Sequence, residues 1–412
     1  MSASRPLAQP PPAPVRDAGL RRDPYTWLAY GLLACFAHVQ AGLGPLIAFL
    51  RAELGLSYTV GGLHVSAFAL GMVGGGLSGD RLAARWGRRR LLWRGTAGMA
   101  AGTLFLGLAH HVALTVAAAL LIGFLGILVV IMVQATLSDH HGPRRAAALT
   151  EANLGAILAA GLAPLCLGLA HGTRLGWRAA LGGAVLALAL VALAGRRLAV
   201  PSAVPPVAAM APRRRLPAVF WALWTVLLLT VAMEWSVVGW GTELLANLGG
   251  LSLDRAAPLF SLYFAGGAVG RFANSRWAVR VPARHLLLYM LAVVAVGLPL
   301  FWLVNQAGLR LAGLALLGFG ISSLFPLGLG AALEVAQDHS DAASSRVTLA
   351  AGTAMLLAPF TLGWLADHVG LQRAFGVVAL FLVAAVAVTL ATHRALTRRD
   401  GAVLASGHEA GR

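Results

Sequence analysis

An isolated acid lies within a long apolar run of the sequence. Glu234 belongs to the segment MEWSVVGW, residues 233–240, and it is the only acid that we expect well inside such a run. A carboxyl group desolvated in this way can bind and release a proton near neutral pH. The alternative is an acid that caps a helix or forms an ion pair near a surface. Glu234 is the first candidate for proton transfer or ligand binding.

Further polar or aromatic side chains interrupt other apolar runs. His38 can titrate or donate a hydrogen bond, but a lone histidine on an apolar helix is as often a packed structural residue. Trp235 offers a flat apolar surface for stacking, whereas we expect Trp240 to anchor the chain at an interface. The other primary candidates are Gln40, Gln134, Ser322 and Ser323, and the secondary candidates are His64, Asn153 and Tyr263.

Several chemistries are not expected. Cys35 and Cys166 both lie in apolar runs, where a free cysteine is a small packing residue, so we expect neither a disulfide nor a metal site. No nucleotide-binding loop of the form GxxxxGK[ST] occurs, which excludes ATP hydrolysis by this chain. The sequence predicts no cofactor and no enzyme activity.

The elements that carry these residues are predicted to cross a membrane. The 412 residues are 58% apolar and have a mean hydropathy of +0.77, far above the needs of a soluble core. A spanning helix needs about 20 apolar residues. We expect an all-α membrane protein of twelve spans, at 25–50, 57–79, 91–109, 112–137, 147–170, 177–195, 218–242, 256–273, 285–304, 309–333, 346–366 and 373–393.

The arginines predict the orientation of the spans. Both termini and every second loop lie on one side of the membrane, and that side has 26 of the 32 basic residues. The other side has the remaining six: Arg51, Arg174, Arg178, Arg255, Arg310 and Arg373. Because basic loops stay in the cytoplasm, both termini are predicted to be cytoplasmic in an inner-membrane protein. The Pro-rich residues 1–24 are expected to be a disordered cytoplasmic tail and 396–412 a second cytoplasmic tail. The topology of the spans explains the net charge of +17, so no nucleic-acid partner is expected.

An internal repeat divides the chain. Residues 162–183 resemble residues 357–378 at an offset of 195, with Pro164 matching Pro359 and Arg178 matching Arg373. The sequence predicts two parallel six-helix halves, at 25–195 and 218–395, joined by a basic, Pro-rich cytoplasmic linker at 196–217.

The segment GDRLAARWGRRR, residues 79–90, follows the second predicted span. Together with twelve spans and a 6+6 repeat, this Gly/Asp/Arg loop resembles the major facilitator superfamily, in which such a loop clamps helices near the cytoplasmic surface. The resemblance implies a gating role for Asp80, Arg81, Arg85, Gly87, Arg88 and Arg89, and for Arg276 in the corresponding loop of the second half. Here the acid stands at Asp80, one helical turn before the usual place at Ala84. A charge cluster that only sets topology is the alternative.

Three short sequence segments are similar to the fucose permease branch of sugar porters. They are MEWSVVGWGTELL in the seventh span, TEANLGAILAAGLAPL in the fifth and GFGISSLFP in the tenth. This resemblance implies solute/proton symport. However, the first-span acid of a fucose permease is absent, and Gln134 stands near the place of its fourth-span acid.

Together these features predict a secondary active transporter that moves a neutral or weakly polar small molecule, including sugar-like solutes, by alternating access with a proton. The alternatives are proton-driven efflux of hydrophobic compounds and a non-transporting sensor or lipid-handling protein. Because no arginine is expected in mid-span, phosphate esters and dicarboxylates are disfavoured. The expected partners are a small molecule, H+ and the lipid bilayer, and the chain is expected to be a monomer.

Overall fold

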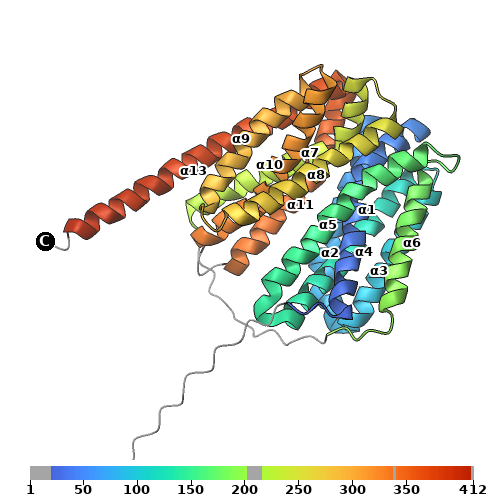
Figure 1. Cartoon of the computed structure of the whole chain (residues 1–412), viewed down its shortest axis with the longest axis horizontal. Coiled ribbons are helices and arrows are strands. Elements are labelled where there is room, and N and C mark those ends of the chain that lie inside the picture. The colour runs from blue at the N-terminus through green and yellow to red at the C-terminus, as the bar shows by residue number, and fades with distance from the viewer. Residues whose placement is uncertain (1–19, 202–215, 337–339, 410–412) are drawn as a thin grey trace, which may run out of the picture.

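Helices account for nearly all of the computed structural model, which describes residues 20–201, 216–336 and 340–409 (Figure 1). Within these residues the first bundle contains the following helices: α1 (Pro24–Leu54), α2 (Tyr58–Trp86), α3 (Arg88–Leu108), α4 (Val112–His141), α5 (Arg145–His171) and α6 (Arg178–Gly195). The second bundle contains α7 (Ala218–Gly249), α8 (Leu253–Trp277), α9 (Ala283–Trp302), α10 (Ala307–Ala336), α11 (Ser340–Val369), the short α12 (Leu371–Ala374) and α13 (Gly376–Glu409).

Local signals set the ends of several helices. The side chain of Asp23 accepts a hydrogen bond from the backbone N–H of Thr26 and so caps α1, and Ser57 caps α2 in the same way. Gly55 and Gly250 end α1 and α7 in the left-handed conformation, which a residue without a Cβ atom adopts at little cost. Short turns of this kind keep consecutive helices antiparallel.

Nine segments within the described residues are long and apolar enough to cross a membrane, and one of them, Val112–His171, covers both α4 and α5. α3 and α8 are not among the nine, because an arginine, Arg94 or Arg271, and several glycines lower the mean hydropathy of their most apolar stretches. The structure confirms an all-helical, multi-pass chain, while the number of twelve spans stays a prediction.

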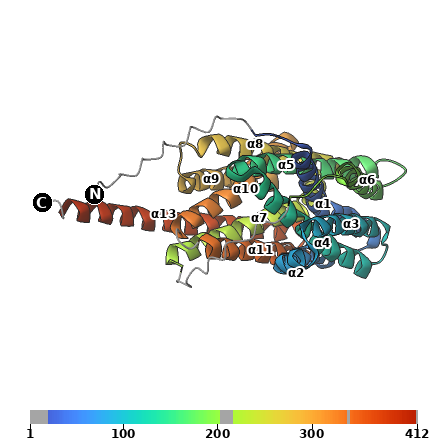
Figure 2. The ribbon, with the colours of Figure 1, turned by 90° about the horizontal axis from the view of Figure 1, so that it is seen from below.

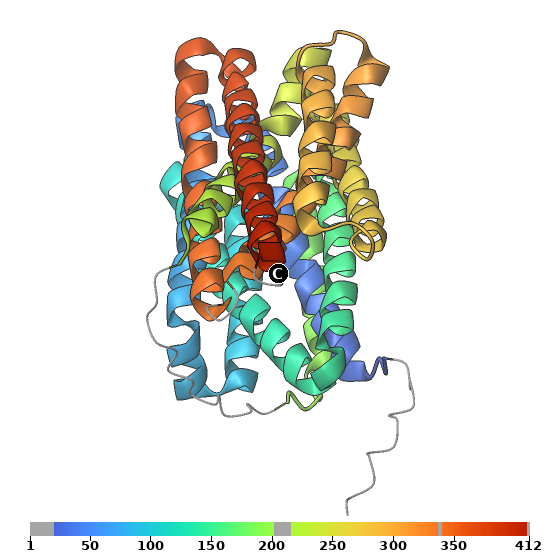
Figure 3. The same cartoon turned by 90° about the vertical axis from the view of Figure 1, so that its left-hand side faces the viewer.

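The two bundles repeat one pattern of helix packing (Figures 1 and 2). In the first, α1 packs on α5, and α4 packs on both α2 and α3; in the second, α7 packs on α11, and α10 packs on both α8 and α9. Figure 3 shows the second bundle from the outside, with α13 in front, and Figure 1 shows that the C-terminal part of α13 projects beyond the bundle. The predicted 6+6 repeat therefore corresponds to a repeat in three dimensions. The predicted tail at 1–24 and linker at 196–217 lie mostly outside the described residues.

Within the described residues the bundles meet chiefly where α2 packs on α11, α5 on α8, and α1 on α7. We call the end with the turns at Gly55, Gly176, Gly250 and Gly370 the Arg-poor end, and the end with the turns at Gly87 and Gly142 the Arg-rich end. Contacts between bundles gather toward the Arg-poor end. For example, a Cβ atom added to Gly44 of α1 would overlap with the carbonyl oxygen of Val238 in α7. The bundles are closed against each other there.

Candidate functional site

A cavity of about 280 Å³ lies between the two bundles. Its walls come from α1, α4 and α5 of the first bundle and from α7, α8 and α10 of the second. The predicted site residues that line it are Gln40, Gln134, Glu234, Trp235 and Ser322 from the primary group, and Asn153 and Tyr263 from the secondary group. The fold therefore collects in one place polar groups that are up to 282 positions apart in the sequence, from Gln40 to Ser322.

Glu234 projects into this cavity from α7 and is half-buried. Within the described chain no hydrogen bond or ion pair joins its carboxylate to another residue. Arg271 and Tyr263, both on α8, lie within electrostatic range of it. The acid thus lies within electrostatic range of one cation, in a cavity lined by polar as well as apolar side chains.

Arg271 corrects the expectation that no arginine lies in mid-span. Residues 271–277 continue α8 as a regular helix to Trp277, so Arg271 lines the cavity instead of belonging to a loop. Its Nε–H donates to the backbone oxygen of Ser322 at 3.2 Å, while the side chain remains exposed to the cavity. The argument against phosphate esters and dicarboxylates, which depended on a cavity without arginine, is therefore wrong.

The hydroxyl group of Tyr263 is buried without a hydrogen-bond partner among the described residues. The ring stacks on Phe260 with centroids 5.6 Å apart and planes 6° apart, which fixes its direction. Buried hydroxyl groups normally have partners. Tyr263 lines the cavity, but its hydroxyl is itself shielded from it in the state described.

Neutral polar groups and apolar rings complete the lining. Gln134 is exposed to the cavity, Gln40 donates to Sδ of Met72 at 3.5 Å, and Asn153 donates to the backbone oxygen of Leu149 at 2.7 Å. The hydroxyl of Ser322 donates to the backbone oxygen of Gly267 at 3.0 Å. The aromatic rings that line the cavity beside Tyr263 are those of Phe36, Trp235 and Phe264.

Three predicted site residues lie outside this cavity. Nδ1 of His38 is 3.0 Å from the backbone oxygen of Ala159, beside a separate apolar void of about 30 Å³. The hydroxyl of Ser323 accepts a hydrogen bond from Asn274 at 2.8 Å. His64 is fully buried, with Nε2 2.8 Å from Oγ1 of Thr115 on α4 and Nδ1 2.9 Å from the backbone oxygen of Val60. In the state described, each of the three is held by contacts with the protein outside the cavity, and its role in the site stays a prediction.

Trp240 is not an interfacial anchor. Its ring is fully buried, and its Nε1–H donates to the backbone oxygen of Pro359 on α11 at 2.9 Å. On the same side of the cavity, the Asp367 carboxylate of α11 accepts from the backbone N–H groups of Tyr58 and Thr59 at 2.7 and 2.8 Å. Together with the ion pair between Arg51 and Glu243, these contacts close the Arg-poor end. The sequence reasoning missed the roles of Arg51, Glu243 and Asp367 because each pairs across bundles.

The predicted gating loop turns between α2 and α3 at Gly87. Asp80, Arg81 and Arg85 are exposed, and within the described chain no ion pair joins Asp80 to another residue. Arg88 pairs with Asp139 of α4 at 2.5 Å, and Arg89 donates to the backbone oxygen of Arg196 at 3.2 Å. The second-half counterpart, Arg276, stacks over the ring of Phe272 at 5.1 Å. The gating role stays a prediction.

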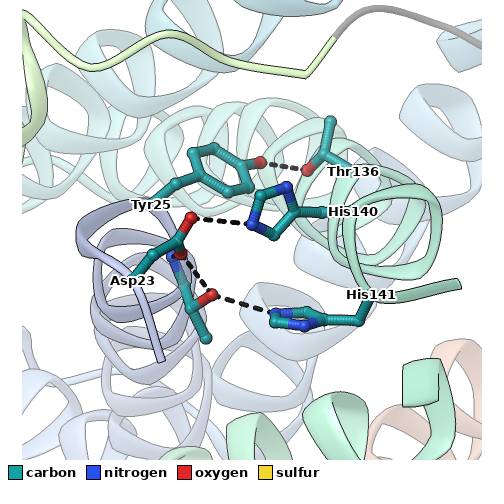
Figure 4. A network of polar contacts seen from close by, with 6 residues as sticks. Asp23, Tyr25, Thr136, His140 and His141 are labelled. Carbon is teal, nitrogen blue, oxygen red and sulfur yellow. Dashed lines mark hydrogen bonds and ion pairs between the residues drawn. The ribbon is translucent and has the colours of Figure 1, made fainter. Parts of the chain in front are cut away.

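A polar network ties the start of α1 to α4 at the Arg-rich end (Figure 4). Nε2 of His140 is 2.7 Å from the Asp23 carboxylate, the hydroxyl of Thr26 is 2.9 Å from Nε2 of His141, and the hydroxyl of Tyr25 donates to Thr136. Burial alone would raise the pKa of Asp23, but hydrogen bonds from Thr26 and His140 outweigh it and hold that pKa below its usual value. Nearby, Glu151 pairs with Arg22 at 2.6 Å.

Within the described residues no group of three histidine, cysteine, aspartate or glutamate side chains is placed to hold a metal ion, and Cys35 and Cys166 are free thiols. The arrangement can instead bind a small molecule by charge, hydrogen bonds and aromatic contact.

Two helical bundles that are related by a repeat and share a polar central cavity define a secondary membrane transporter. The chain belongs to the Major Facilitator Superfamily, whose family model matches residues 26–304 and 242–407. It is accordingly a transporter and not an enzyme.

Known relatives agree with this assignment. An uncharacterised MFS-type transporter of Yersinia pestis is 27% identical over 165 residues, which are 40% of this chain and 42% of that protein, so the match spans less than half of the relative. Among solved structures, an inward-facing, unoccupied bacterial homologue of the human lysosomal transporter Spinster matches with a TM-score of 0.70 and 15% identity, over 90% of this chain and 96% of that one. Nucleoside transporter NupG matches with a TM-score of 0.70 and 12% identity, over 90% and 98%. At these identities the two structures show the fold alone, and the resemblance to fucose permeases is not confirmed.

Proposed function

We propose that this protein carries a small organic molecule across the inner membrane by alternating access, together with a proton, and that it acts as a monomer. The observation that carries the proposal is the carboxylate of Glu234 in the cavity between the bundles, without a hydrogen-bond partner in the described chain and close to Arg271. An acid in such a place exchanges protons with whichever side the cavity faces. Closure at the Arg-poor end leaves the Arg-rich end as the way into the cavity.

The proposed orientation places the Arg-rich end, both termini and the linker in the cytoplasm. In the state described, the cavity then opens toward the cytoplasm. To test this, Cys35 and Cys166 are replaced by alanine, and single cysteines are introduced at Ala278, beyond α8, and at Leu175, between α5 and α6. In intact cells an impermeant thiol reagent should label only the variant at Leu175; labelling at Ala278 contradicts the orientation.

Proteoliposome uptake tests the transport proposal. A panel of polar organic solutes is offered under an imposed pH gradient to the parent protein, to Glu234→Gln and to Glu334→Gln. Glu334 is a matched control because it is an exposed acid on α10 outside the cavity. We expect gradient-driven accumulation by the parent and by the Glu334 variant, and its loss in Glu234→Gln without loss of folded protein.

Each other outcome has a meaning. Accumulation by Glu234→Gln with the parental pH dependence excludes Glu234 as the proton-binding group. Outward movement of hydrophobic dyes by the parent, driven by the proton gradient, indicates efflux instead. A folded parent protein that moves no solute indicates a sensor or lipid-handling protein.

A further inference from the structure

The cavity holds hydrogen-bonding groups that the described protein does not satisfy. Arg271 uses only its Nε–H, in the bond to Ser322, and no hydrogen bond from its two terminal nitrogens to another described residue is present. The Tyr263 hydroxyl has no partner among the described residues but is shielded by the surrounding protein, and no described residue donates a hydrogen bond to the carboxylate of Glu234. Arg271 therefore presents hydrogen-bond donors to whatever occupies the cavity.

The charges in the cavity form one pair. Glu234 on α7 lies within electrostatic range of Arg271 and Tyr263 on α8. The polar groups that the other helices contribute to the described lining are all neutral: Gln40 from α1, Gln134 from α4, Asn153 from α5 and Ser322 from α10. When Glu234 is ionised, the two charges compensate each other. When Glu234 is protonated, the cavity carries a single positive charge on a guanidinium with free donors.

We propose that the transported molecule is an organic acid with a single negative charge, that Arg271 binds its carboxylate, and that Glu234 carries the accompanying proton. This inference rests on the proposed function and names the chemical class of its substrate. A guanidinium matches a carboxylate through two parallel N–H···O bonds. The rings of Phe36, Trp235 and Phe264 contact the organic part of the molecule.

The same geometry couples the two ligands. An ionised Glu234 offsets the charge of Arg271 and repels a second carboxylate, so it weakens binding of the anion. Protonation of Glu234 removes this repulsion, and a bound anion favours protonation of Glu234 by the same factor. The loaded cavity then carries one proton and one anion, and one complete transfer moves no net charge.

The presence of one cation in the described lining also limits the charge of the substrate. A dicarboxylate or phosphate ester brings a second negative charge, for which the described lining offers no second cation, and burying an uncompensated charge is costly. A neutral solute leaves the terminal nitrogens of Arg271 unpaired. The monoanion is the charge state that the lining compensates.

Matched pairs of probes test the inference in proteoliposomes. The carboxylates lactate, benzoate and nicotinate are compared with their amides, lactamide, benzamide and nicotinamide, with protein-free liposomes as the blank for passive diffusion. We expect uptake of at least one carboxylate and not of its amide. That uptake should be driven by an inward pH gradient and should be unchanged when valinomycin and K+ set the membrane potential, because the transfer is electroneutral.

Variants of two arginines on α8 supply the matched control. Arg271→Gln should weaken carboxylate binding by about tenfold to a hundredfold, the range for a lost charge-assisted hydrogen bond. Arg271→Lys should keep part of the affinity, because lysine keeps the positive charge but lacks the two parallel N–H donors of the guanidinium. Arg255→Gln removes an exposed arginine at the other end of the helix and should bind as the parent does.

The outcomes separate this inference from the proposed function. Proton-driven uptake of amides without uptake of any carboxylate overturns the monoanion and leaves proton-coupled transport standing. Carboxylate uptake that Arg271→Gln does not change, or that responds to the membrane potential, also overturns it. If none of these probes moves but the parent accumulates another solute of the wider panel, the inference fails and the proposed function stands. If nothing in either set moves, or if uptake ignores the pH gradient, both fail together.

Discussion

Arg51 of α1 and Glu243 of α7 form an ion pair that joins the two bundles at the Arg-poor end. Their side chains are only 12% and 15% exposed, and the Arg51 guanidinium also lies 3.5 Å from the centre of the Tyr58 ring. Removal of one partner of a shielded pair leaves the other charge without compensation. The pair is therefore placed to stabilise the state in which this end is closed.

Glu243→Gln should shift the protein toward the state that is open at the Arg-poor end. A loss of about 1.4 kcal/mol changes the ratio of the two states about tenfold. A cysteine at Thr242, which is buried in the closed state, should then react about tenfold faster with a thiol reagent in a background without Cys35 and Cys166. The exchanged pair, Arg51→Glu with Glu243→Arg, should recover part of the protection. Equal reactivity in all variants contradicts a closing role for the pair.

Gly44→Ala should hinder the same closure by a steric route. The added methyl group would overlap with the carbonyl oxygen of Val238, which belongs to a helix backbone and cannot rotate away. We expect faster labelling of a cysteine at Thr242 and slower transport. Gly182→Ala on α6 is the control, because the new Cβ atom meets nothing within 4 Å while the gain in helix propensity is the same. If both variants transport at the parental rate, the close contact of α1 with α7 at Gly44 is not needed for closure.

Asp80→Asn should favour the state that is open at the Arg-rich end and slow the transport cycle. In the state described, Asp80 is exposed at that end, so a clamp that uses it would form only when that end closes. A partly screened pair contributes about 1 kcal/mol, which changes a balanced equilibrium about fivefold. Moving the acid, as Asp80→Gly with Ala84→Asp, should restore the rate.

Asp139→Asn is the control for Asp80→Asn, because it removes an ion pair within one bundle and leaves the proposed clamp intact. It breaks the pair with Arg88 inside the first bundle, so it should lower the melting temperature without changing the balance between open states. Transport by Asp80→Asn at the parental rate, or no recovery in the relocated variant, would leave the arginine cluster with a topological role alone.

Asp23→Ala should lower the free energy of unfolding by about 1 kcal/mol at pH 7, the usual cost of a lost helix cap. Because the pKa of Asp23 is held below its usual value, its ionised form stabilises the folded state at neutral pH. That contribution should persist as the pH falls and disappear only below the ordinary aspartate pKa of about 3.9. Thermal unfolding of both proteins in detergent from pH 7 to pH 4 measures it. A difference that already vanishes near pH 6 would show that the carboxylate is not stabilised as described, and Asp23→Asn, which keeps the acceptor, separates the cap from the charge.

Composition and local pattern determined much of this protein without its tertiary structure. Runs of about 20 apolar residues can satisfy their backbone groups in a bilayer only as helices, so the helices lie where the sequence predicts them, often with a few more residues at each end. The offset that matches Pro164 with Pro359 correctly indicated two repeats. Glu234 stood out because a charged residue in an apolar run has few explanations.

Only the tertiary structure decided which side of each helix faces the cavity. On a helix surrounded by lipid and by other helices, every face is apolar, so the sequence lacks the polar stripe that shows the rotation of a helix in a soluble protein. Arg271 therefore looked like a loop residue, Trp240 like an anchor and His38 like a cavity residue. The pair of Arg51 with Glu243 joins positions 192 residues apart, and its existence depends on how two bundles meet, which is set by packing across their interface and not by any local pattern.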